Sequence, residues 1–274
     1  MSVLAARVDL DDAYAKMVAA MRQRRRVLVA YSGGVDSGLV ARVARDALGD
    51  DALAALADAE SVSRHELVEA RAEAEEIGIG IRVLEVSELA NKAYVANPTN
   101  RCYFCRKELA RGLRPLAAEL GYTTIADGVN LSDLGDHRPG IQAMDEEGFW
   151  HPLVEFGLAK ADVRELSRRL GLSFHAKPSN ACLSSRIAYG EVITVEKLQR
   201  IDAAEEAIRA LGFDVVRVRA HEGIARIEVL PKDLPRLVEP AVAEKVVQAV
   251  RDAGFLHVTL DLRGYRSGSM NEGL

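Results

Sequence analysis

The sequence predicts an α/β protein with a doubly wound parallel sheet and a smaller C-terminal α+β domain. Over the first 180 residues, short apolar runs rich in β-forming residues alternate with longer segments of helical periodicity. This alternation is typical of parallel strands joined by crossover helices. After Pro178 the order changes to helix, two strands, helix and strand. We therefore expect two domains, comprising residues 1–180 and 181–274.

The first domain opens with helical spacing of Ala, Met and Arg over residues 12–24, and the apolar run at 27–31 predicts the first strand. Further strands are expected at 52–57, 81–86 and 123–126, and further helices at 63–77, 107–120 and 160–170. Each of these later helices is followed by a glycine, which is common just beyond a helix C-terminus. These glycines are Gly78, Gly121 and Gly171.

The second domain opens with a helix that Thr194 is expected to cap and Gly212 to end. Apolar side chains recur at helical spacing between these two residues. The remaining elements expected here are strands at 214–219 and 225–230, a helix from about 233 to 253 and a final strand at 256–262.

Composition and charge exclude several classes of protein. The chain has 274 residues, of which 49% are hydrophobic and 28% charged, so it has a real core and is neither disordered, collagen-like nor a coiled coil. With 36 basic and 41 acidic residues, the net charge of −5 creates no global attraction to nucleic acid or anionic lipid. Apolar stretches fall short of the roughly 20 residues of a membrane helix. We expect a soluble, cytoplasmic protein without a secretion signal.

The strongest motif is Ser32-Gly33-Gly34-Val35-Asp36-Ser37, placed where the first strand passes into a helix. Paired glycines allow backbone N–H groups to converge on an anion, and the helix N-terminus adds positive charge. The loop therefore predicts phosphate binding. It differs from the Walker A pattern because no Lys-Ser or Lys-Thr follows the glycines, which argues against transfer of a γ-phosphate.

Polar residues follow two later strands at the same edge of the predicted sheet. Asp58 follows the second strand, and Asp127-Gly128 follows a later one, with Asn130 nearby. Ligands of open α/β sheets bind at the carboxyl ends of the strands, which favours an ATP or magnesium site here. An Asp-Gly pair also caps ordinary turns, so that alternative stays open for Asp127.

Cys102, Cys105 and Cys182 are an odd number of cysteines, which argues against a disulfide framework. The first two lie three positions apart at the opening of a helix, where basic neighbours favour thiolates. Three thiolates suit a [4Fe–4S] cluster that leaves one iron open. The alternatives are a redox pair, three buried thiols, or a zinc site with a fourth ligand. Candidates for that ligand are His137, His151 and His175.

These motifs together resemble the LarE family of ATP-dependent sulfurtransferases, which belongs to the PP-loop ATP pyrophosphatases, proteins with an adenine nucleotide alpha hydrolase-like fold. The Ser32–Ser37 loop points to the superfamily, and the segment from Cys182 to Gly190 is specific to the family. The resemblance runs nearly end to end through residues 32–37, 100–105, 126–128, 138–140, 177–178, 182–186, 189–190 and 262–265.

The resemblance implies that ATP adenylates a carboxylate of a pyridinium-3,5-biscarboxylate mononucleotide, on the route to the nickel-pincer nucleotide of lactate racemase. Sulfur then displaces AMP and leaves a thiocarboxylate. ATP would contact Ser32, Gly33, Gly34, Val35, Asp36, Ser37, Asp58, Asp127 and Gly128, with Asp36 on Mg²⁺. Some members sacrifice the cysteine at the position of Cys182. Others hold a [4Fe–4S] cluster on three cysteines whose open iron carries sulfide, and this chain, with all three, favours that form.

The substrate of the family carries phosphate and carboxylates, so cationic side chains are expected to line its site. The candidate substrate residues are Arg186, Arg217, Arg219, Glu206, Glu228, Arg263 and Arg266. Any single one of these arginines is also compatible with an ordinary solvated surface position. The resemblance assigns ATP cleavage to residues 1–180 and substrate binding or oligomerisation to residues 181–274, with a sulfide donor and a homo-oligomer as expected partners.

Three rival functions compete with this interpretation. A tRNA thiolation enzyme shares the loop, but it needs a basic surface or an RNA-binding module. An amidotransferase-type synthetase would use ammonia and need no cysteine trio. A non-catalytic iron–sulfur or zinc module would tolerate loss of the loop. The acidic net charge and the cysteine trio favour the sulfurtransferase.

Overall fold

The computed structural model describes residues 8–135, 139–178 and 181–266. The chain divides into two compact units. Unit 1 comprises Met1–Ala59, Glu66–Ser87 and Asn100–Asn180, and unit 2 comprises Glu60–His65, Glu88–Thr99 and Ala181–Leu274. Two short segments that precede residue 180 in the sequence therefore pack with the C-terminal residues. The separate functions assigned to residues 1–180 and 181–274 stay a prediction.

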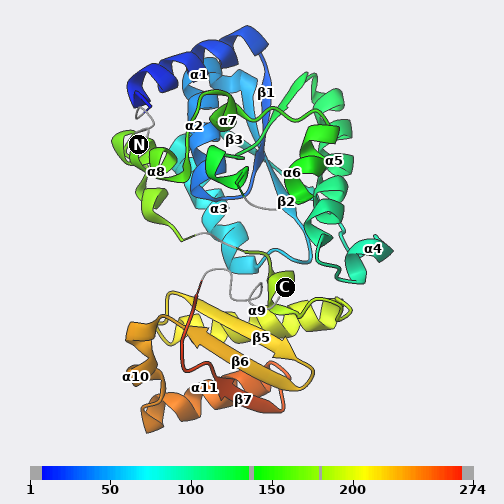
Figure 1. Ribbon diagram of the computed structural model, residues 1–274, viewed down its shortest axis with the longest axis vertical. Coiled ribbons are helices and arrows are strands. Elements are labelled where there is room, and N and C mark those ends of the chain that lie inside the picture. Colours follow the sequence, from blue (N-terminus) through cyan, green and yellow to red (C-terminus); the bar gives the residue numbers. More distant parts are fainter. Residues whose placement is uncertain (1–7, 136–138, 179–180, 267–274) are drawn as a thin grey trace, which may run out of the picture. The chain divides into compact units, whose positions relative to one another are not determined.

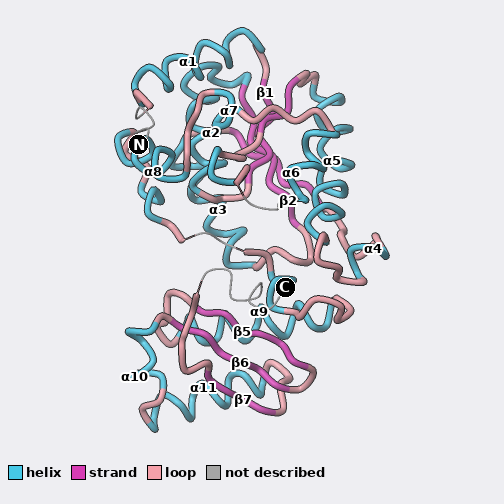
Figure 2. Tube along the Cα trace, in the orientation of Figure 1, coloured by secondary structure: helices cyan, strands magenta, loops and turns pink. Residues whose placement is uncertain are grey.

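Unit 1 is built on a sheet of four parallel strands in the order β3-β2-β1-β4 (Figures 1 and 2). The strands are β1 (Val27–Tyr31), β2 (Ala52–Asp58), β3 (Gly80–Glu85) and β4 (Thr124–Ala126). Val27 pairs with Ala52 on one side and with Thr124 on the other. The chain therefore runs outward from β1 through β2 to β3 and returns to the opposite side of β1. This reversal confirms the doubly wound parallel sheet.

Helices cover both faces of this sheet (Figure 1). Their bounds are α1 (Leu10–Arg24), α2 (Val35–Leu48), α3 (Arg64–Ile77), α5 (Arg101–Leu120), α6 (Pro139–Glu146), α7 (Pro152–Glu155) and α8 (Lys160–Arg169). On the α5 side, Leu28 and Ala30 of β1 pack against Leu113 and Met144. The fully buried strand β1 has the continuous apolar sequence expected of a central parallel strand.

Unit 2 contains a three-stranded sheet in the order β5-β6-β7, with β5 antiparallel and β7 parallel to β6. Its elements are α4 (Lys92–Val95), α9 (Val195–Ala210), β5 (Val216–His221), β6 (Ile224–Val229), α10 (Leu234–Leu237), α11 (Pro240–Asp252) and β7 (His257–Leu260). Thr194 caps α9 as expected, because its hydroxyl accepts a hydrogen bond from the Lys197 N–H. Both α9 and α11 contribute buried apolar side chains to this unit.

Two predicted helices differ from the structure. The helix expected at 107–120 begins six residues earlier, at Arg101, so Cys102 and Cys105 lie within its first turns. The helix expected at 233–253 is divided into α10 and α11. The division comes from Pro240, because a proline disfavours helical backbone at the residue before it and suits the first turn of a new helix.

The described part of the chain also contains 3₁₀ turns at Gly49–Asp51, Leu131–Asp133, Ser173–Ala176, Leu183–Arg186 and Pro231–Asp233. Within the residues described, the helices are all too short or too polar to cross a membrane.

Candidate active site

The Ser32–Ser37 loop, called the phosphate loop below after the binding that its sequence predicts, connects β1 to α2, and its geometry requires its glycines. Gly33 has a φ of +68°, a conformation that side chains disfavour. A Cβ at Gly33 would also lie 2.5 Å from the Cβ of Ala70 on α3. Gly34 is the N-cap of α2, so the first N–H groups of this helix, which have no partner within the helix, follow it directly.

Two serine hydroxyls close the loop on itself. The Ser37 hydroxyl donates to the carbonyl of Gly34 at 3.2 Å and accepts from the N–H of Ser32 at 3.2 Å. The hydroxyls of Ser32 and Ser37 lie 3.1 Å apart. These hydrogen bonds fold the loop back on the N-terminus of α2, which is where a phosphate would be bound.

Asp36, the predicted magnesium ligand, lies in the first turn of α2 and is paired with two side chains. One carboxylate oxygen accepts from Asn130 at 3.2 Å, and the other contacts the Lys160 ammonium. Lys160 is the first residue of α8. Sequence reasoning missed Lys160, because the lysine is 124 positions from Asp36 in the chain.

Asp127 and Gly128 follow β4 and lie beside this loop. A Cβ on Gly128 would lie only 2.6 Å from the backbone nitrogen of Ser37, so the two backbones are in close contact. The Asp127 carboxylate accepts from the Val129 N–H at 3.1 Å and lies 2.6 Å from Nδ1 of His151. Asp127 therefore caps a turn, which is the alternative that the sequence left open, and its neighbour Gly128 contacts the phosphate loop.

His151 is bonded at both ring nitrogens to carboxylates, Asp127 at Nδ1 and Asp145 at Nε2 over 3.0 Å. Burial of the ring lowers its pKa, but the hydrogen bonds and charges of these two aspartates outweigh burial, so the pKa of His151 is raised. Both ring nitrogens of His151, one of the candidates for a fourth zinc ligand, are thus bonded to aspartates in this structure. His175, another such candidate, bonds the Leu172 carbonyl through Nδ1 at 2.8 Å.

The loop after β1 and the Asp127–Gly128 turn after β4 face each other at the point where the strand order reverses. This switch point is where open α/β sheets bind their ligands. Asp58 ends β2, on the other side of β1, and its carbonyl accepts from the Val86 N–H at 3.1 Å. The carboxyl edge of the sheet thus brings together all three of the strand ends singled out in the sequence.

A buried ion cluster lies against the loop and was not predicted. Lys177 donates to the Gly33 carbonyl at 2.9 Å and to Glu73 at 2.6 Å. Burial raises the pKa of Glu73, although the Lys177 ammonium opposes this shift. The Tyr31 hydroxyl donates to the Ala70 carbonyl, and burial raises its pKa too.

None of the three cysteines forms a disulfide in the described structure. Cys102, which is exposed, and Cys105, which is half-buried, belong to α5 in unit 1. Cys182 is half-buried in unit 2 and is the N-cap of the 3₁₀ turn Leu183–Arg186. Within the described ranges, no group of three or more His, Cys, Asp or Glu side chains is arranged to hold a metal ion. His137 and Arg138 lie outside the residues described.

Arg186, the first of the candidate substrate residues, is only 1% exposed and forms a fork with Glu205 of α9 at 2.8 and 3.1 Å. Its guanidinium also donates to the Cys182 carbonyl at 2.9 Å and bonds the Ala181 carbonyl. Burial would raise the pKa of Glu205, but Arg186 reverses this effect, and the pKa is lowered. Arg186 thereby fixes the cysteine segment on α9.

Arg217 and Arg219 lie on the same face of β5, as their spacing predicted, and both are buried. Arg219 forms a fork with Glu228 of β6 at 3.0 and 2.8 Å and donates to the Ser185 carbonyl at 2.9 Å. The Arg217 guanidinium lies 5.3 Å from the centre of the Tyr265 ring. Arg217, Arg219 and Glu228 therefore form one polar face of this sheet.

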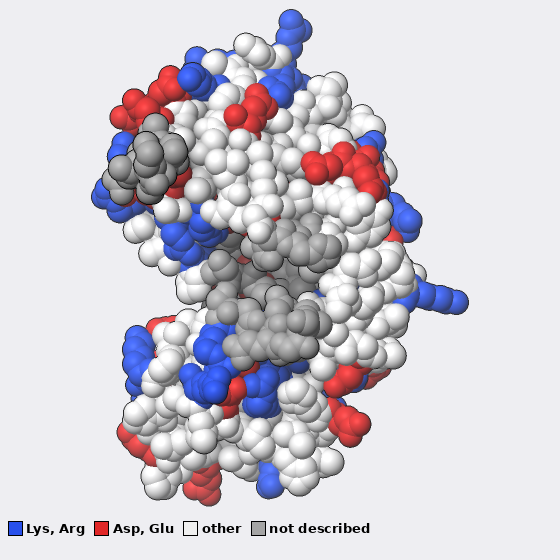
Figure 3. All heavy atoms as spheres, viewed as in Figure 1, with Lys and Arg blue, Asp and Glu red and all other residues white. Residues whose placement is uncertain are grey.

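The remaining candidates are more exposed. Arg263 is exposed, and Arg266 lies 3.9 Å from Asp261. Glu206 is exposed on α9 and lies 3.6 Å from Arg209. On the face of the molecule drawn in Figure 3, Lys and Arg gather over β5 and β6 of unit 2, whereas both signs of charge are scattered elsewhere.

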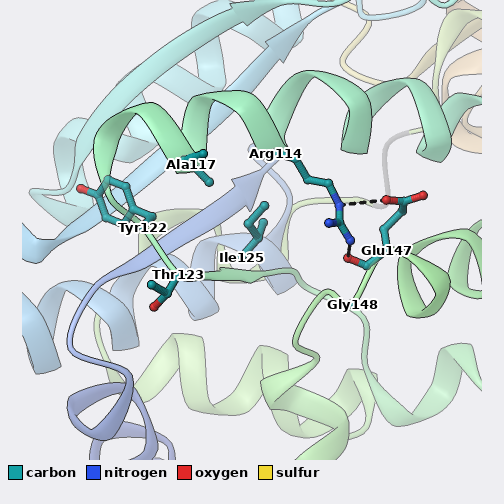
Figure 4. A pocket seen from close by; sticks show the side chains of 8 residues that line it. Arg114, Ala117, Tyr122, Thr123, Ile125, Glu147 and Gly148 are labelled. Carbon is teal, nitrogen blue, oxygen red and sulfur yellow. Dashed lines mark hydrogen bonds and ion pairs between the residues drawn. The ribbon is translucent and has the colours of Figure 1, made fainter.

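A pocket of about 280 Å³ lies away from the phosphate loop, beside the start of β4 (Figure 4). It is lined by Arg114, Ala117, Ala118, Tyr122, Thr123, Ile125, Glu147 and Gly148. Arg114 points toward Glu147 and pairs with its carboxylate at 2.8 Å. The residues predicted to bind ATP do not line this pocket, because they follow the opposite, carboxyl ends of the strands.

Comparisons with known proteins agree with the loop and the fold. Residues 8–109 match the NAD synthase family model. A pyridinium-3,5-bisthiocarboxylic acid mononucleotide synthase of Lactiplantibacillus plantarum is 38% identical over 95% of this chain and 94% of its own length. An uncharacterised protein of Synechocystis is 51% identical over 90% of this chain and 92% of its own. An uncharacterised protein of Methanocaldococcus jannaschii is 27% identical over 89% of this chain and 92% of its own length.

The L. plantarum relative matches both units of the structure rather than the loop alone, since 262 residues are aligned. This coverage confirms the resemblance that the loop and cysteine motifs indicated. The chain belongs to the family of the pyridinium-3,5-bisthiocarboxylic acid mononucleotide synthase, LarE.

Proposed function

We propose that this ATP-using sulfurtransferase adenylates a carboxylate of pyridinium-3,5-biscarboxylic acid mononucleotide and converts it to a thiocarboxylate. The substrate class follows from the name of the L. plantarum relative. The single observation that carries the proposal is the Ser32–Ser37 loop at the switch point between β1 and β4, with Gly128 in close contact with the N-terminus of α2.

The chemistry needs two steps because a carboxylate has no good leaving group. A substrate carboxylate oxygen first attacks the α-phosphorus of ATP, the bond to the β-phosphate oxygen breaks, and pyrophosphate leaves. A sulfur nucleophile then attacks the acyl carbon, and the C–O bond to AMP breaks. The N–H groups at the start of α2 and the Lys160 ammonium would stabilise the negative charge that develops on the departing pyrophosphate.

Magnesium fits the donor set at this edge, because Asp36, Asp127 and Asn130 supply the oxygen ligands that Mg²⁺ prefers. A bound Mg²⁺ would neutralise phosphate charge there. Asp36 is paired with Lys160 in the structure. The approach of a triphosphate gives the ammonium a second anionic partner and leaves the Asp36 carboxylate available to a cation.

The three cysteines fit an iron–sulfur cluster by their chemistry, since none is in a disulfide and thiolates are the usual ligands of such clusters. Cys102 and Cys105, three residues apart at the start of α5, and Cys182 would hold it. Such a cluster, if bound, would supply the sulfide that attacks the acyl carbon. In the alternative, the Cys182 sulfur attacks the acyl carbon itself, and loss of the Cys182 Hα with cleavage of its Cβ–Sγ bond leaves dehydroalanine.

The polar face of unit 2 supports binding of an anionic substrate. Arg217, Arg219 and Arg226 lie on neighbouring positions of β5 and β6, with Glu228 and Asp261 as their acidic partners. Guanidinium groups held in place by such partners are suited to phosphate and carboxylate. We assign substrate binding and assembly of a homo-oligomer to residues 181–274, and ATP cleavage to residues 1–180.

The test is an assay of the purified chain with ATP, Mg²⁺, sulfide and the biscarboxylate mononucleotide. We expect AMP and pyrophosphate in equal amounts, together with a nucleotide whose mass reflects replacement of oxygen by sulfur. Asp36→Ala is expected to abolish all three products. Release of ADP and phosphate, or AMP formation without the nucleotide, would contradict the proposal.

A further inference from the structure

One lysine links the phosphate loop to the segment that precedes Cys182 in the sequence. The Nζ of Lys177 donates to the carbonyl of Gly33 at 2.9 Å, although the two residues are 144 positions apart. The Lys177 side chain is only 13% exposed. A charged group at this depth needs partners. One partner of the Lys177 ammonium is a backbone carbonyl of the phosphate loop.

The other partners of Lys177 are acidic and come from α3. Its ammonium lies 2.6 Å from Glu73 and 3.1 Å from Glu69. Glu73 is 8% exposed and also accepts from the Tyr31 hydroxyl at 3.4 Å. The Glu73 carboxylate thus holds the ammonium from the side of α3, on which Gly33 is packed.

The backbone of Lys177 is held independently of its side chain. Its N–H donates to the Phe174 carbonyl at 2.9 Å, and its carbonyl accepts from Arg164 at 2.8 Å. Phe174 packs closely on α2, where a Cβ at Gly38 would lie 2.5 Å from the ring. Backbone and side-chain contacts therefore both fix the position of the Lys177 Nζ.

The hydrogen bond from Lys177 to the Gly33 carbonyl determines the direction of the Gly34 N–H. A trans peptide is planar, with its C=O and N–H directed oppositely. The carbonyl of Gly33 and the N–H of Gly34 belong to one peptide, so Lys177 turns the Gly34 N–H away from itself. Glycine rotates freely, and a Gly-Gly peptide without such a bond has no side chain to hold it in this orientation.

We propose that Lys177 is a positioning residue for ATP, which orients the Gly33–Gly34 peptide so that the Gly34 N–H faces the bound phosphate. This inference rests on the proposed function, since it assumes that the loop binds ATP. It predicts that loss of Lys177 weakens nucleotide binding even when the charge of Glu73 is removed as well.

The experiment is calorimetric titration of ATP into the full-length chain with Mg²⁺. Lys177→Met alone leaves Glu73 unpaired and destabilises the fold, so the informative variant is the pair Lys177→Met with Glu73→Gln. We expect this double variant to unfold at nearly the wild-type temperature. It should bind ATP about tenfold more weakly, because the hydrogen bond from the Gly34 N–H to the charged phosphate is lost. Lys16→Met, which breaks an exposed pair with Asp12 on α1, is the matched control and should bind ATP as the wild type does.

The outcomes separate the two proposals. Wild-type affinity in the double variant would overturn the positioning role, because Lys177 would then only balance the charge of Glu73. Glu73→Gln alone keeps the bond from Lys177 to Gly33 and is expected to bind ATP within about twofold of the wild type, since it removes no phosphate donor. If the wild-type protein itself does not bind ATP, the proposed function is wrong.

Discussion

Asp36 and Lys160 form an ion pair at the carboxyl edge of the parallel sheet, joining the first turn of α2 to the first turn of α8. Asn130, from the segment after β4, donates to the other oxygen of the same carboxylate. Three elements therefore converge on one acidic side chain of the phosphate loop. In the proposed function, the cation that balances Asp36 is also the cation that an incoming triphosphate would meet.

Lys160→Met should raise the KM for ATP about tenfold or more, because a charge-assisted contact to phosphate is lost. Stability should change little, since the pair with Asp36 is partly exposed, at 31% and 21%. Steady-state kinetics with varied ATP and a thermal melt test both statements. Lys197→Met, which breaks a comparably exposed pair with Glu191 in unit 2, serves as the control. An unchanged KM for ATP in Lys160→Met would contradict the role assigned to the ammonium.

Gly128→Ala tests the close contact between the turn after β4 and the phosphate loop. The added methyl would lie 2.6 Å from the Ser37 nitrogen, so the start of α2 must shift. A displacement of about 1 Å in a positioned site is enough to lower kcat/KM for ATP roughly 100-fold. Gly135→Ala, whose new methyl would lie at an ordinary contact distance of 3.9 Å from the Ser132 carbonyl among the described residues, should keep full activity. Equal activity of the two variants would show that the contact is not needed.

The bonds of His151 to Asp127 and Asp145 predict a pH dependence of stability. Its pKa is raised in the folded state, so the protonated ring is favoured there. The resulting stability is fully present below the ordinary value of 6.5 and is lost as pH rises through the raised pKa. In thermal melts, the difference between wild type and His151→Gln should shrink as pH rises above this range. A difference in melting temperature that stays constant with pH would refute the raised pKa of His151. His257→Gln, at an exposed position of β7, is the control for loss of a histidine.

Glu205 is fully buried and accepts hydrogen bonds from Arg186, Arg209 and the Val218 N–H. Glu205→Gln leaves the Arg186 guanidinium without its paired charge and should lower the free energy of unfolding by roughly 3–5 kcal/mol. Glu206→Gln changes the neighbouring exposed carboxylate and should cost little stability. Denaturant melts compare the two variants, and equal midpoints would show that the buried fork does not stabilise unit 2.

Local patterns in the sequence predicted most of the fold. The strand expected at 27–31 coincides with β1, and the loop signal lay where β1 passes into α2. These features depend on neighbouring residues, so a short window of sequence is sufficient to find them. The single helix expected from 233 to 253 is wrong, because Pro240 stands at the first position of a new helix, α11.

The charged partners of the site were harder to predict. Lys160 and Lys177 reach the loop from more than 100 positions away, and only the tertiary packing brings them there. The burial of Glu205, by contrast, is indicated by its position in the sequence. Glu205 lies on the apolar face of α9 with Ile201 and Ile208, where a carboxylate needs a buried cation, and that cation is Arg186.

The source of the sulfur is decided by comparing the three cysteines one at a time. If sulfide reaches the acyl adenylate from an iron–sulfur cluster, Cys102→Ala and Cys105→Ala should each abolish thiocarboxylate formation, because each removes a cluster ligand. Anaerobically purified wild type should then contain roughly four irons per chain, and each variant should lose them. AMP–pyrophosphate formation should persist in both variants, since the phosphate loop is unchanged.

A sacrificial Cys182 predicts a different pattern from the same variants. Cys102→Ala and Cys105→Ala would then remain active for one turnover, and Cys182→Ala alone would be inactive. Mass spectrometry of the wild type after turnover would show Cys182 short by the elements of H₂S. Intact Cys182 after several turnovers excludes that route, because a sulfur taken from a Cβ–Sγ bond leaves dehydroalanine, which cannot supply sulfur a second time.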